Sequence, residues 1–593
     1  GKCKGDYVQH RLTDFLKESV LVEEKRLIEQ IVSQHKPWIE GCIEVGYVIV
    51  PRQVVIQVSE KTDDLIWVRI HPNYSAKIRI GWPLLIYDLI RNEYIAGVVS
   101  AMGYDIEDPQ VYERESIYPR VVLTSELIKY GDFEFLEHLP VYGVEPICTL
   151  RNENGKMRRG SINFSPHARA PVFLPPNHII LKVLGLPEKG IPYGVIMVGE
   201  DLAIDPTTGQ YLVYRLRPFL LFEHELVLGS TGKGKTSKCK NDIFWFIKWL
   251  NGTVIVFDLH GEYSMISEDP MEEYKGKIND LEINIWEAIN AKPTKINDVV
   301  VWFWVPASES NKYRDKSTKH VKFFSIKFNE IPPNELQYYL PALSPQGYYV
   351  LPSLIREFRR EGGKTLEEFY EWLQDQKFER KRVAPATLYA IIRRIASILE
   401  EDIFDGVLPD ISTDQIFVPG RVNIINLVHV KSQIARRIIV FHVINKVASV
   451  KLRDHQNKLP CTMLLIDEAH QFFPKKVKDR DEADYIDRAV RWMARICREG
   501  RKFQLRVEIS TQSPEDLHPE VIKVVNTITF LGCTLSQAKA LENIMNPLPV
   551  SKKDLINLET RQAIIWSRDN AKIPIKVLIP WPLLKHPIKK KEE

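Results

Sequence analysis

The sequence predicts an α/β protein from about residue 226 onward, and three observations support that prediction. Residues 226–250 read as a short apolar strand, a glycine-rich turn and a helix that ends where Asn251 and Gly252 follow. Residues 253–258, TVIVFD, form a continuous apolar run, which is typical of a parallel strand buried on both faces. Strands that alternate with helices predict a parallel sheet covered by helices. Further strand patterns follow at residues 422–427, 462–467, 505–510 and 527–532.

The residues that precede this core divide into two parts. Residues 1–40 place apolar side chains at helical spacing as far as Pro37, and we interpret them as an amphipathic helical extension. Residues 41–220 contain short β-branched runs that end at proline, glycine, asparagine or aspartate. Short strands at this density predict a small β-barrel domain with extensions.

The α/β core is predicted to be interrupted. Its first part covers residues 221–330 and its second part residues 407–570, and residues 571–593 form a C-terminal segment with a basic end. Between the two parts, residues 331–406 contain four helical patterns and no strand pattern, which predicts an inserted helical bundle. One of these helices begins with the spacing of a capping box, formed by Thr365 and Glu368.

Length and composition are those of a folded protein with several domains. The 593 residues allow about three or four domains of roughly 150 residues each. Hydrophobic residues make up 44% and charged residues 27%, which argues against a disordered chain. The net charge is only +4, so binding to a polyanion has to depend on local basic patches.

The cysteines and the apolar stretches predict a soluble cytoplasmic protein. The seven cysteines never stand in CxxC spacing, so buried thiols in a reducing compartment are favoured over zinc sites or disulfides. Apolar stretches such as residues 438–450 are interrupted by polar side chains. They fall short of the roughly 18 apolar residues that a membrane helix needs, so no membrane attachment is expected.

Residues 229–236, GSTGKGKT, fit the phosphate-binding pattern G-x-x-x-x-G-K-[ST]. The pattern follows a strand and opens a helix, so backbone N–H groups and the helix N-terminus would converge on the phosphates of ATP. Lys235 would add a point charge and Thr236 a hydroxyl ligand for Mg²⁺. The alternative is a glycine-rich turn with a solvated lysine. The residues expected to hold the nucleotide are Gly229, Thr231, Gly232, Lys233, Gly234, Lys235, Thr236 and Ser237.

A triphosphate site also needs acidic residues, and Asp467 and Glu468 follow an apolar strand pattern. Asp467 would hold Mg²⁺ through water, and Glu468 would accept a proton from the attacking water. The alternative is that an acid at this place only caps the helix that follows. Together with the phosphate loop, the sequence favours the metal and catalytic roles.

Two other strand ends are expected to face the same crevice, since parallel sheets bind ligands at the C-terminal ends of their strands. Gln512 is a candidate sensor of the γ-phosphate, with a polar turn residue as the alternative. Asp258 and Glu262 are expected at the nucleotide site next to the loop. His260 lies between them, but a single histidine favours hydrogen bonding over a second metal ion.

An amphipathic helix is predicted before Gly500, which is expected to be its C-cap. One side of the helix is apolar, and basic residues recur beside it every three or four positions. This basic face is either simply solvated, or it brings Arg498 or Arg501 to a neighbouring subunit's γ-phosphate as an arginine finger. The apolar side consists of Val490, Met493 and Cys497, and the basic side of Arg491, Arg495, Arg498 and Lys502.

The charged connection ahead of this helix contains Lys475, Lys476 and Lys478. In a ring of ATPases a loop at this place would point toward the central pore, where lysines could follow the phosphate backbone of DNA. A plain solvated loop is the alternative. Because no base-reading motif is present, any contact with DNA is expected to be independent of sequence.

Five motifs, taken in order, resemble those of the HerA-like helicases and translocases in the wider HerA and FtsK superfamily. The resemblance covers about residues 43–580 and is strongest over residues 220–535. The ordered set is far more specific than any single motif. The motifs are GSTGKGKTS at 229–237, VFDLHGEYS at 256–264, LLIDEAHQFFP at 464–474, CREGRKFQL at 497–505 and ISTQSPEDL at 509–517.

The resemblance implies a hexameric, DNA-translocating ATPase with an N-terminal β-barrel, a RecA-like P-loop NTPase core with a helical insertion, and a C-terminal segment that braces the adjacent subunit. It implies partners as well, because archaeal members of the family act with the nuclease NurA in DNA end resection and bacterial relatives serve in phage defence. Carried over by position, the implied roles are phosphate and Mg²⁺ binding for Lys235 and Thr236, metal and catalytic acids for Asp467 and Glu468, the sensor for Gln512, and contacts between subunits for the arginines near 498.

The sequence departs from the family pattern at three places. Leu259 stands where the family has proline in its Asp-x-His-Gly-Glu motif. Residues 510–514 read STQSP, without the arginine of the common Ser-Gln-Arg-Pro run, so the role of that arginine is left unfilled. The helical extension before residue 40 is not part of the usual pattern and points to a different or additional partner.

Three hypotheses of function stand beside one another. The first is an ATP-hydrolysing ring that moves DNA, with a NurA-type nuclease as its partner in DNA end processing or repair. The second is a nucleotide-gated scaffold that recruits an effector nuclease, which the N-terminal extension and the near-neutral net charge fit equally well. The third, a conjugation or secretion motor, predicts membrane attachment, and no segment of the sequence supports it.

Overall fold

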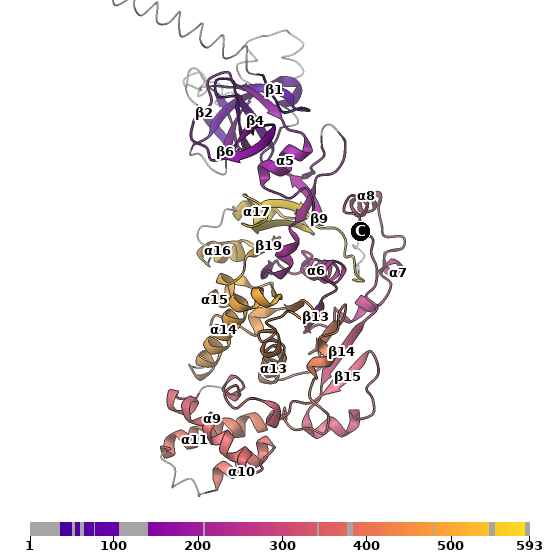
Figure 1. Cartoon of the computed structure of the whole chain (residues 1–593), viewed down its shortest axis with the longest axis vertical. Helices are drawn as coiled ribbons and strands as arrows, with labels where there is room; N and C mark the ends of the chain where they lie inside the picture. The colour runs from indigo at the N-terminus through magenta and orange to yellow at the C-terminus, as the bar shows by residue number, and fades with distance from the viewer. Residues whose placement is uncertain are drawn as a thin grey trace, which may run out of the picture. The chain divides into compact units, whose positions relative to one another are not determined.

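A computed structural model of the chain describes residues 36–587, except 50–53, 60–63, 76–77, 106–139, 206–207, 341–342, 376–382, 478–479 and 545–551. The described residues form two compact units (Figure 1). The first unit contains the residues up to 188 together with 197–212, and the second contains 189–196 together with those from 213 onward. The predicted helical extension lies outside the described residues, apart from 36–40.

Six strands of the first unit close into a barrel, as the sequence predicts. Their order is β5, β4, β8, β1, β3 and β6, and antiparallel pairing of β5 with β6 closes the ring. Strand β2 pairs with β5, and β7 pairs with β6. The strands are β1 Ile43–Val48, β2 Val54–Ser59, β3 Ile66–Ile70, β4 Pro83–Asp88, β5 Glu93–Asp105, β6 Pro140–Glu153, β7 Lys156–Gly160 and β8 Pro171–Leu174.

Alternation along β4 separates the two faces of the barrel wall. Leu84 and Ile86 lie in an apolar cluster that receives side chains from all six strands of the ring. Leu85 and Tyr87 point to the other face and lie in a second cluster with helix α5 (Asn177–Leu184). The barrel therefore has a filled interior and an apolar layer outside it.

The second unit is built on a mixed sheet, in which the described residues supply eight parallel strands. Their order is β19, β12, β18, β17, β13, β16, β14 and β15, and antiparallel β20, β21 and β9 follow beyond β19. All of β13 is buried, which confirms the prediction from its continuous apolar run. The strands are β9 Ile191–Val198, β12 Glu225–Leu228, β13 Thr253–Asp258, β14 Val299–Trp304, β15 Val321–Phe324, β16 Val422–Asn426, β17 Thr462–Ile466, β18 Leu505–Thr511, β19 Thr527–Leu531, β20 Gln562–Ser567 and β21 Ile575–Leu578.

Two helices of this unit, α6 (Lys235–Leu250) and α14 (Arg480–Gly500), end in different ways. Helix α6 ends as predicted, because Asn251 adopts the left-handed conformation with φ of 47°. The expectation that Gly500 is a left-handed C-cap is wrong, since its φ is −58° and the left-handed residue is Gln504. Gly500 serves a close approach instead: a Cβ atom there would lie 3.0 Å from the carbonyl oxygen of Leu505.

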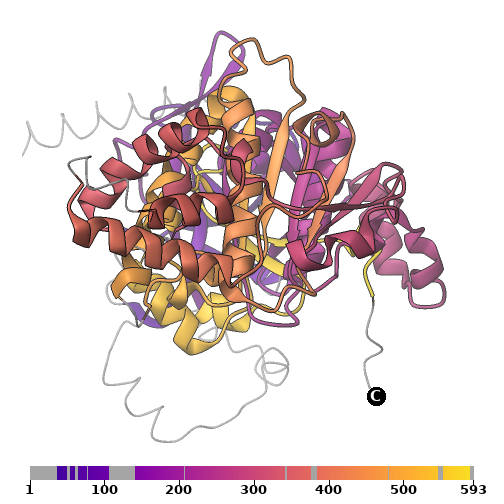
Figure 2. The same ribbon diagram turned by 90° about the horizontal axis from the view of Figure 1, so that it is seen from below.

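The described residues of the inserted region form helices that lie beside one another (Figure 2). They are α9 (Pro345–Arg360), α10 (Leu366–Gln374) and α11 (Pro385–Leu399). The capping box at the start of α10 is present as predicted. The first of the four predicted helical patterns forms only a 3-10 turn at Leu336–Tyr338 within the described residues. Pro341 cannot continue a helix that begins at Pro333, which limits this pattern to about two turns.

The C-terminal segment packs along its own chain as far as residue 587. After β21 it passes α6 and α7 (Pro270–Tyr274), and the Tyr274 hydroxyl donates to the carbonyl oxygens of Pro582 and Leu584 at 2.8 and 3.1 Å. Asn241 of α6 accepts a hydrogen bond from the Leu583 N–H at 2.7 Å. The described part of this segment is therefore held by hydrogen bonds to helices of its own chain.

The described helices include none that is both long and apolar enough to cross a membrane. Four of the six described cysteines are buried, and the six are free thiols in this structure.

Candidate nucleotide site

The phosphate loop lies between β12 and α6, at the C-terminal end of β12. Strands β13, β17 and β18 run parallel to β12, so their C-terminal ends lie at the same edge of the sheet. Asp258, Asp467 and Thr511 stand at or directly after those ends. The structure thus brings the predicted strand ends to one edge.

The loop backbone has the conformation that its glycines permit. Gly232 and Gly234 have φ values of 80° and 98°, in the left-handed region that favours glycine. A Cβ atom at Gly229 would lie 2.7 Å from Cβ of Leu531, so only glycine fits there. The side chain of Lys233 donates to the carbonyl oxygen of Leu558 at 2.7 Å, which ties the loop to the turn before β20.

Lys235 contacts one of the two predicted acids and is influenced by the charge of the other. Its Nζ atom is 3.0 Å from Oε1 of Glu468, and both side chains are less than one-tenth exposed. Burial by itself would lower the pKa of Lys235, but the charges of Asp467 and Glu468 raise it. The predicted lysine and catalytic acid are therefore in direct contact, and a phosphate group would compete with Glu468 for the ammonium group.

Asp467 has an environment that suits a divalent cation. Burial raises the pKa of its carboxyl group, and the charge of Lys235 opposes that rise. The hydroxyl of the buried Tyr263 lies 3.4 Å from Asp467 Oδ2 and can donate to it. Oxygen atoms are the ligands that Mg²⁺ prefers, so the side chains of Asp467 and Thr236 have the chemistry to hold this ion.

Glu468 adopts an uncommon backbone conformation. Its φ and ψ are 49° and 46°, which for a residue other than glycine costs about 1 kcal/mol or more. One carboxylate oxygen, Oε2, is buried and accepts no hydrogen bond from the described residues. Backbone strain of this kind is typical of residues held for function rather than for stability.

His470 is a neighbour of this acid that sequence reasoning missed. Its Nδ1 atom lies 3.4 Å from Oε2 of Glu468 and 3.0 Å from the hydroxyl oxygen of Thr511. It stands two residues after Glu468 within a motif of the quoted set, and that spacing was the only available signal.

Asp258, at the end of β13, accepts hydrogen bonds from the loop that follows it. Its Oδ1 atom accepts N–H groups of three following residues, including Gly261 at 2.8 Å, and its Oδ2 accepts the Tyr263 N–H at 3.0 Å. The carboxylate therefore organises its own loop, which in turn positions Tyr263 beside Asp467. Glu262 is half-buried in this loop, and His260 is exposed and belongs to no metal-binding group among the described residues.

Gln512 is brought to the phosphate loop as expected. The Thr231 hydroxyl donates to Oε1 of Gln512 at 2.5 Å, and Gln537 donates to the Gln512 carbonyl oxygen at 2.5 Å. The end of β18 is therefore linked directly to the loop that would hold the phosphates.

The basic helix α14 has the predicted two sides, with its apolar stripe buried and its basic residues exposed. The helix leads from the C-terminal end of β17 to the start of β18, so it ends at the edge of the sheet opposite the phosphate loop. Arg501 lies 2.8 Å from the buried Glu223, two residues before β12, which agrees with that placement. Neither Arg498 nor Arg501 can therefore reach the nucleotide site of its own chain.

Two of the three lysines predicted to contact DNA are described. Lys475 and Lys476 are exposed, and the Lys475 N–H donates to the carbonyl oxygen of Asp516 at 2.6 Å. Lys478 lies outside the described residues.

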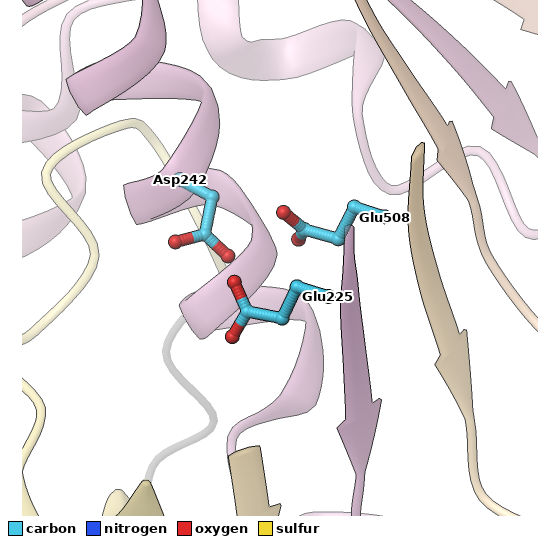
Figure 3. A group of neighbouring side chains, drawn as sticks. All are labelled: Glu225, Asp242 and Glu508. Atoms are coloured by element: carbon cyan, nitrogen blue, oxygen red, sulfur yellow. The ribbon is translucent and has the colours of Figure 1, made fainter. Parts of the chain in front are cut away.

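A second ionic cluster lies buried below α6 and was not anticipated from the sequence. Glu225, Asp242 and Glu508 point toward one another from α6 and two adjacent strands (Figure 3). Lys238 contacts Glu225 and lies 2.5 Å from Asp242 Oδ2. Arg506 lies 2.5 Å from Glu225 Oε2 and 2.8 Å from Glu508 Oε2. The protein's own cations thus occupy the positions where a metal ion would sit.

Known proteins resemble this chain in sequence. Residues 214–447 match the family described as the central domain of helicase HerA. The DNA double-strand break repair helicase HerA of Sulfurisphaera tokodaii is 23% identical over 442 residues, which cover 72% of this chain and 76% of that protein. The protein of the same name from Sulfolobus acidocaldarius is 21% identical over 376 residues, covering 62% and 66%.

Solved structures resemble the chain more weakly. VirB4 of Thermoanaerobacter pseudethanolicus has a TM-score of 0.42 and 15% identity, over 66% of this chain and 96% of that one. The plasmid coupling protein TrwB in complex with ADP and Mg²⁺ also has a TM-score of 0.42 and 15% identity, over 67% and 98%.

The family match covers the phosphate loop, and the matched relatives extend over most of the chain. The loop itself contacts a buried acid pair through Lys235. By this sequence match, residues 214–447 are similar to the central domain of helicase HerA, and this geometry gives them the phosphate loop of a P-loop ATPase.

Proposed function

We propose that this chain is an ATP-driven DNA translocase or helicase of the HerA type, which works as a homohexameric ring and binds DNA without regard to sequence. The observation that carries the proposal is the contact of Lys235 with Glu468 beside Asp467, at the mouth of the phosphate loop. The relatives that match most of the chain are named as DNA double-strand break repair helicases, which supports DNA as the substrate.

Each residue of the site has its own proposed role in ATP hydrolysis. Backbone N–H groups of the loop and the start of α6 bind the phosphates of ATP, and Lys235 leaves Glu468 to neutralise the γ-phosphate. Thr236 and Asp467 hold Mg²⁺, which supplies Lewis-acid stabilisation of the phosphate charge. Glu468 then orients a water and accepts its proton, and Gln512 contacts the γ-phosphate from the end of β18.

The ring is proposed because the arginine that lies against the phosphate loop among the described residues, Arg561, is already paired with Glu282 at 2.6 Å. Arg498 is exposed at the opposite edge, where it can contact the next subunit, whereas Arg501 is already paired with Glu223. We therefore assign the role of arginine finger to Arg498. Lys475 and Lys476 are proposed to face the DNA backbone, and a NurA-type nuclease is the proposed partner.

Mixed rings test the finger and the ring together. Lys235→Ala and Arg498→Ala proteins should each lose hydrolysis by at least about 100-fold. When the two are mixed, some interfaces combine an intact loop with an intact arginine, so part of the activity should return. Arg501→Ala is the matched control and should retain activity. A mixture that stays inactive contradicts action between subunits.

The effect of DNA on the rate of ATP hydrolysis distinguishes a translocase from a nucleotide-gated scaffold. Linear duplex DNA should stimulate ATP hydrolysis by the wild-type protein, and the effect should weaken as salt is raised because phosphate contacts release counterions. A rate that is the same with and without DNA would favour the scaffold. The mass of the protein, measured with and without Mg·ATP, tests for the hexamer.

A further inference from the structure

The two oxygens of the Glu468 carboxylate have different neighbours. Oε1 is held by Lys235 at 3.0 Å, and Oε2 faces Nδ1 of His470 at 3.4 Å. On the proposed function, the γ-phosphate takes Lys235 away from Oε1 when ATP binds. His470 is then the remaining protein contact that can fix the direction of the carboxylate.

The proton on His470 determines whether this contact is attractive. An ionised carboxylate only accepts hydrogen bonds, so Nδ1 must carry a proton to attract Oε2. The same nitrogen lies 3.0 Å from the Thr511 hydroxyl, whose oxygen also accepts the Ser513 N–H at 3.1 Å. If the hydroxyl donates to Nδ1, the nitrogen presents a lone pair and cannot hold Glu468. The Thr511 contact therefore selects between two states of His470.

Thr511 is also connected to the phosphate loop. The residue that follows it, Gln512, accepts a hydrogen bond from Thr231 at 2.5 Å, and the Thr511 carbonyl oxygen accepts the Gly229 N–H at 3.4 Å. A shift at the end of β18 on phosphate binding would move the Thr511 hydroxyl relative to His470. A chain of contacts thus runs from the phosphate loop to the second oxygen of the acid.

We propose that His470 is a positioning residue that orients the Glu468 carboxylate for proton transfer and couples that orientation to the end of β18. The inference rests on the proposed hydrolysis of ATP at this site. His470 does not touch the nucleotide in this account. It acts through Glu468, and it responds to the phosphate through Thr511 and Gln512.

Three substitutions at two positions test the inference in the full-length protein. His470→Ala should lower kcat about 10- to 100-fold, the range for second contacts of a reacting group, while KM for ATP stays near the wild-type value. His470→Asn should recover most of the rate, because the asparagine amide places a donor where Nδ1 stood. Thr511→Val removes the hydroxyl that competes for Nδ1, so kcat should stay at or above the wild-type value, and a loss as large as that of His470→Ala would contradict the competition.

The pair should behave as one unit. The double variant His470→Ala with Thr511→Val should be no slower than His470→Ala alone, because the two residues act in sequence on one carboxylate. Thr511→Ser keeps the hydroxyl and should retain activity. His178→Ala, at an exposed position in the first unit, is the matched control and should leave kcat unchanged.

The outcomes distinguish a failure of the positioning role from a failure of the proposed ATP hydrolysis on which it rests. Unchanged kcat in His470→Ala, or an equal loss in His470→Asn, overturns the positioning role. A rise in KM together with a fall in the unfolding temperature indicates a structural role and overturns it as well. Glu468→Gln is measured beside them: if it abolishes hydrolysis while His470→Ala does not, only the positioning role fails.

Discussion

Helix α6 contains two lysines, one turn apart, that have different roles. Lys235 and Lys238 are both surrounded by carboxylates, Lys235 by Asp467 and Glu468 and Lys238 by Glu225 and Asp242. Lys235 lies at the phosphate loop and keeps 8% of its surface exposed, whereas Lys238 is fully buried. Similar residue types thus form two different clusters. The cluster around Lys235 is an open site that a phosphate can enter, and the cluster around Lys238 is closed to it.

The two clusters also balance their charge differently. Each has one more carboxylate than cations: one lysine for two acids at Lys235, and Lys238 with Arg506 for three acids. At the open site Mg²⁺ can complete the balance. At the closed site a proton does so, because burial and the neighbouring Glu508 raise the pKa of Asp242 well above its usual value.

The largest expected effect on stability is at the closed cluster. Lys238→Met leaves the three buried acids with Arg506 as their remaining cation and should lower the free energy of unfolding by about 3–5 kcal/mol. Denaturant unfolding of the purified protein measures it. Lys248→Met, at an exposed position on the same helix, is the control. Equal unfolding midpoints for the two variants would show that the cluster does not stabilise the fold.

At the open site around Lys235, a substitution should lower the rate of ATP hydrolysis rather than the stability of the fold. Lys235→Ala removes the charge that meets the γ-phosphate, so hydrolysis should fall by about 10²–10³-fold, or roughly 3–4 kcal/mol of transition-state stabilisation. Its unfolding midpoint should change far less than that of Lys238→Met. A rate close to that of Lys248→Ala would mean that the loop is not the hydrolytic site.

Two acids of the closed cluster should respond in opposite ways. Burial opposes ionisation of Glu225, but Lys238 and Arg506 outweigh it and lower its pKa, so Glu225→Gln should cost about 1–3 kcal/mol at neutral pH. Asp242→Asn mimics the protonated acid and should cost much less. If Glu225→Gln proves the milder change, the proton has been assigned to the wrong residue.

The pH dependence follows from the raised pKa of Asp242. Its contribution to stability is complete below the unfolded value near 3.8 and is lost as pH rises toward the higher folded value. Asp242→Asn should therefore gain stability relative to the wild type as pH rises from about 4. Unfolding midpoints across that range measure the difference, and two parallel curves would contradict it.

The smallest expected effect concerns the hydroxyl of Tyr263. Tyr263→Phe removes one donor to Asp467 without opening a cavity, so it should cost about 0.5–1.5 kcal/mol, a few-fold in rate. The loss should appear as a changed dependence of hydrolysis on Mg²⁺ concentration. Tyr193→Phe, another buried tyrosine, is the comparison. Identical Mg²⁺ curves for the two variants would remove Tyr263 from the metal site.

Local patterns in the sequence predicted the parts of the molecule that local physics determines. The parallel strands were visible as apolar runs, and the phosphate loop was visible because its glycines and Lys235 stand in one short segment. The capping box at Thr365 was found for the same reason. Order along the chain was therefore enough to predict the core and one half of the site.

Residues that act through distant contacts were missed. Glu225 and Glu508 meet only because β12 and β18 pair, although they are far apart in sequence. The role proposed for His470 depends on its contact with Thr511, which lies on β18. The hydrogen bonds from the Asp258 carboxylate to the backbone of its own turn, a common preference of aspartate, were also not predicted. Pairing between strands, rather than composition, decides these contacts.

One measurement tests the central claim most directly: ATP binding and ATP hydrolysis by the Glu468→Gln protein, determined on the same preparation. The substitution keeps the size of the side chain and removes its ability to accept a proton. The account predicts that Mg·ATP still binds with an affinity close to that of the wild type, while hydrolysis falls by at least about 100-fold. Hydrolysis at the wild-type rate would contradict it.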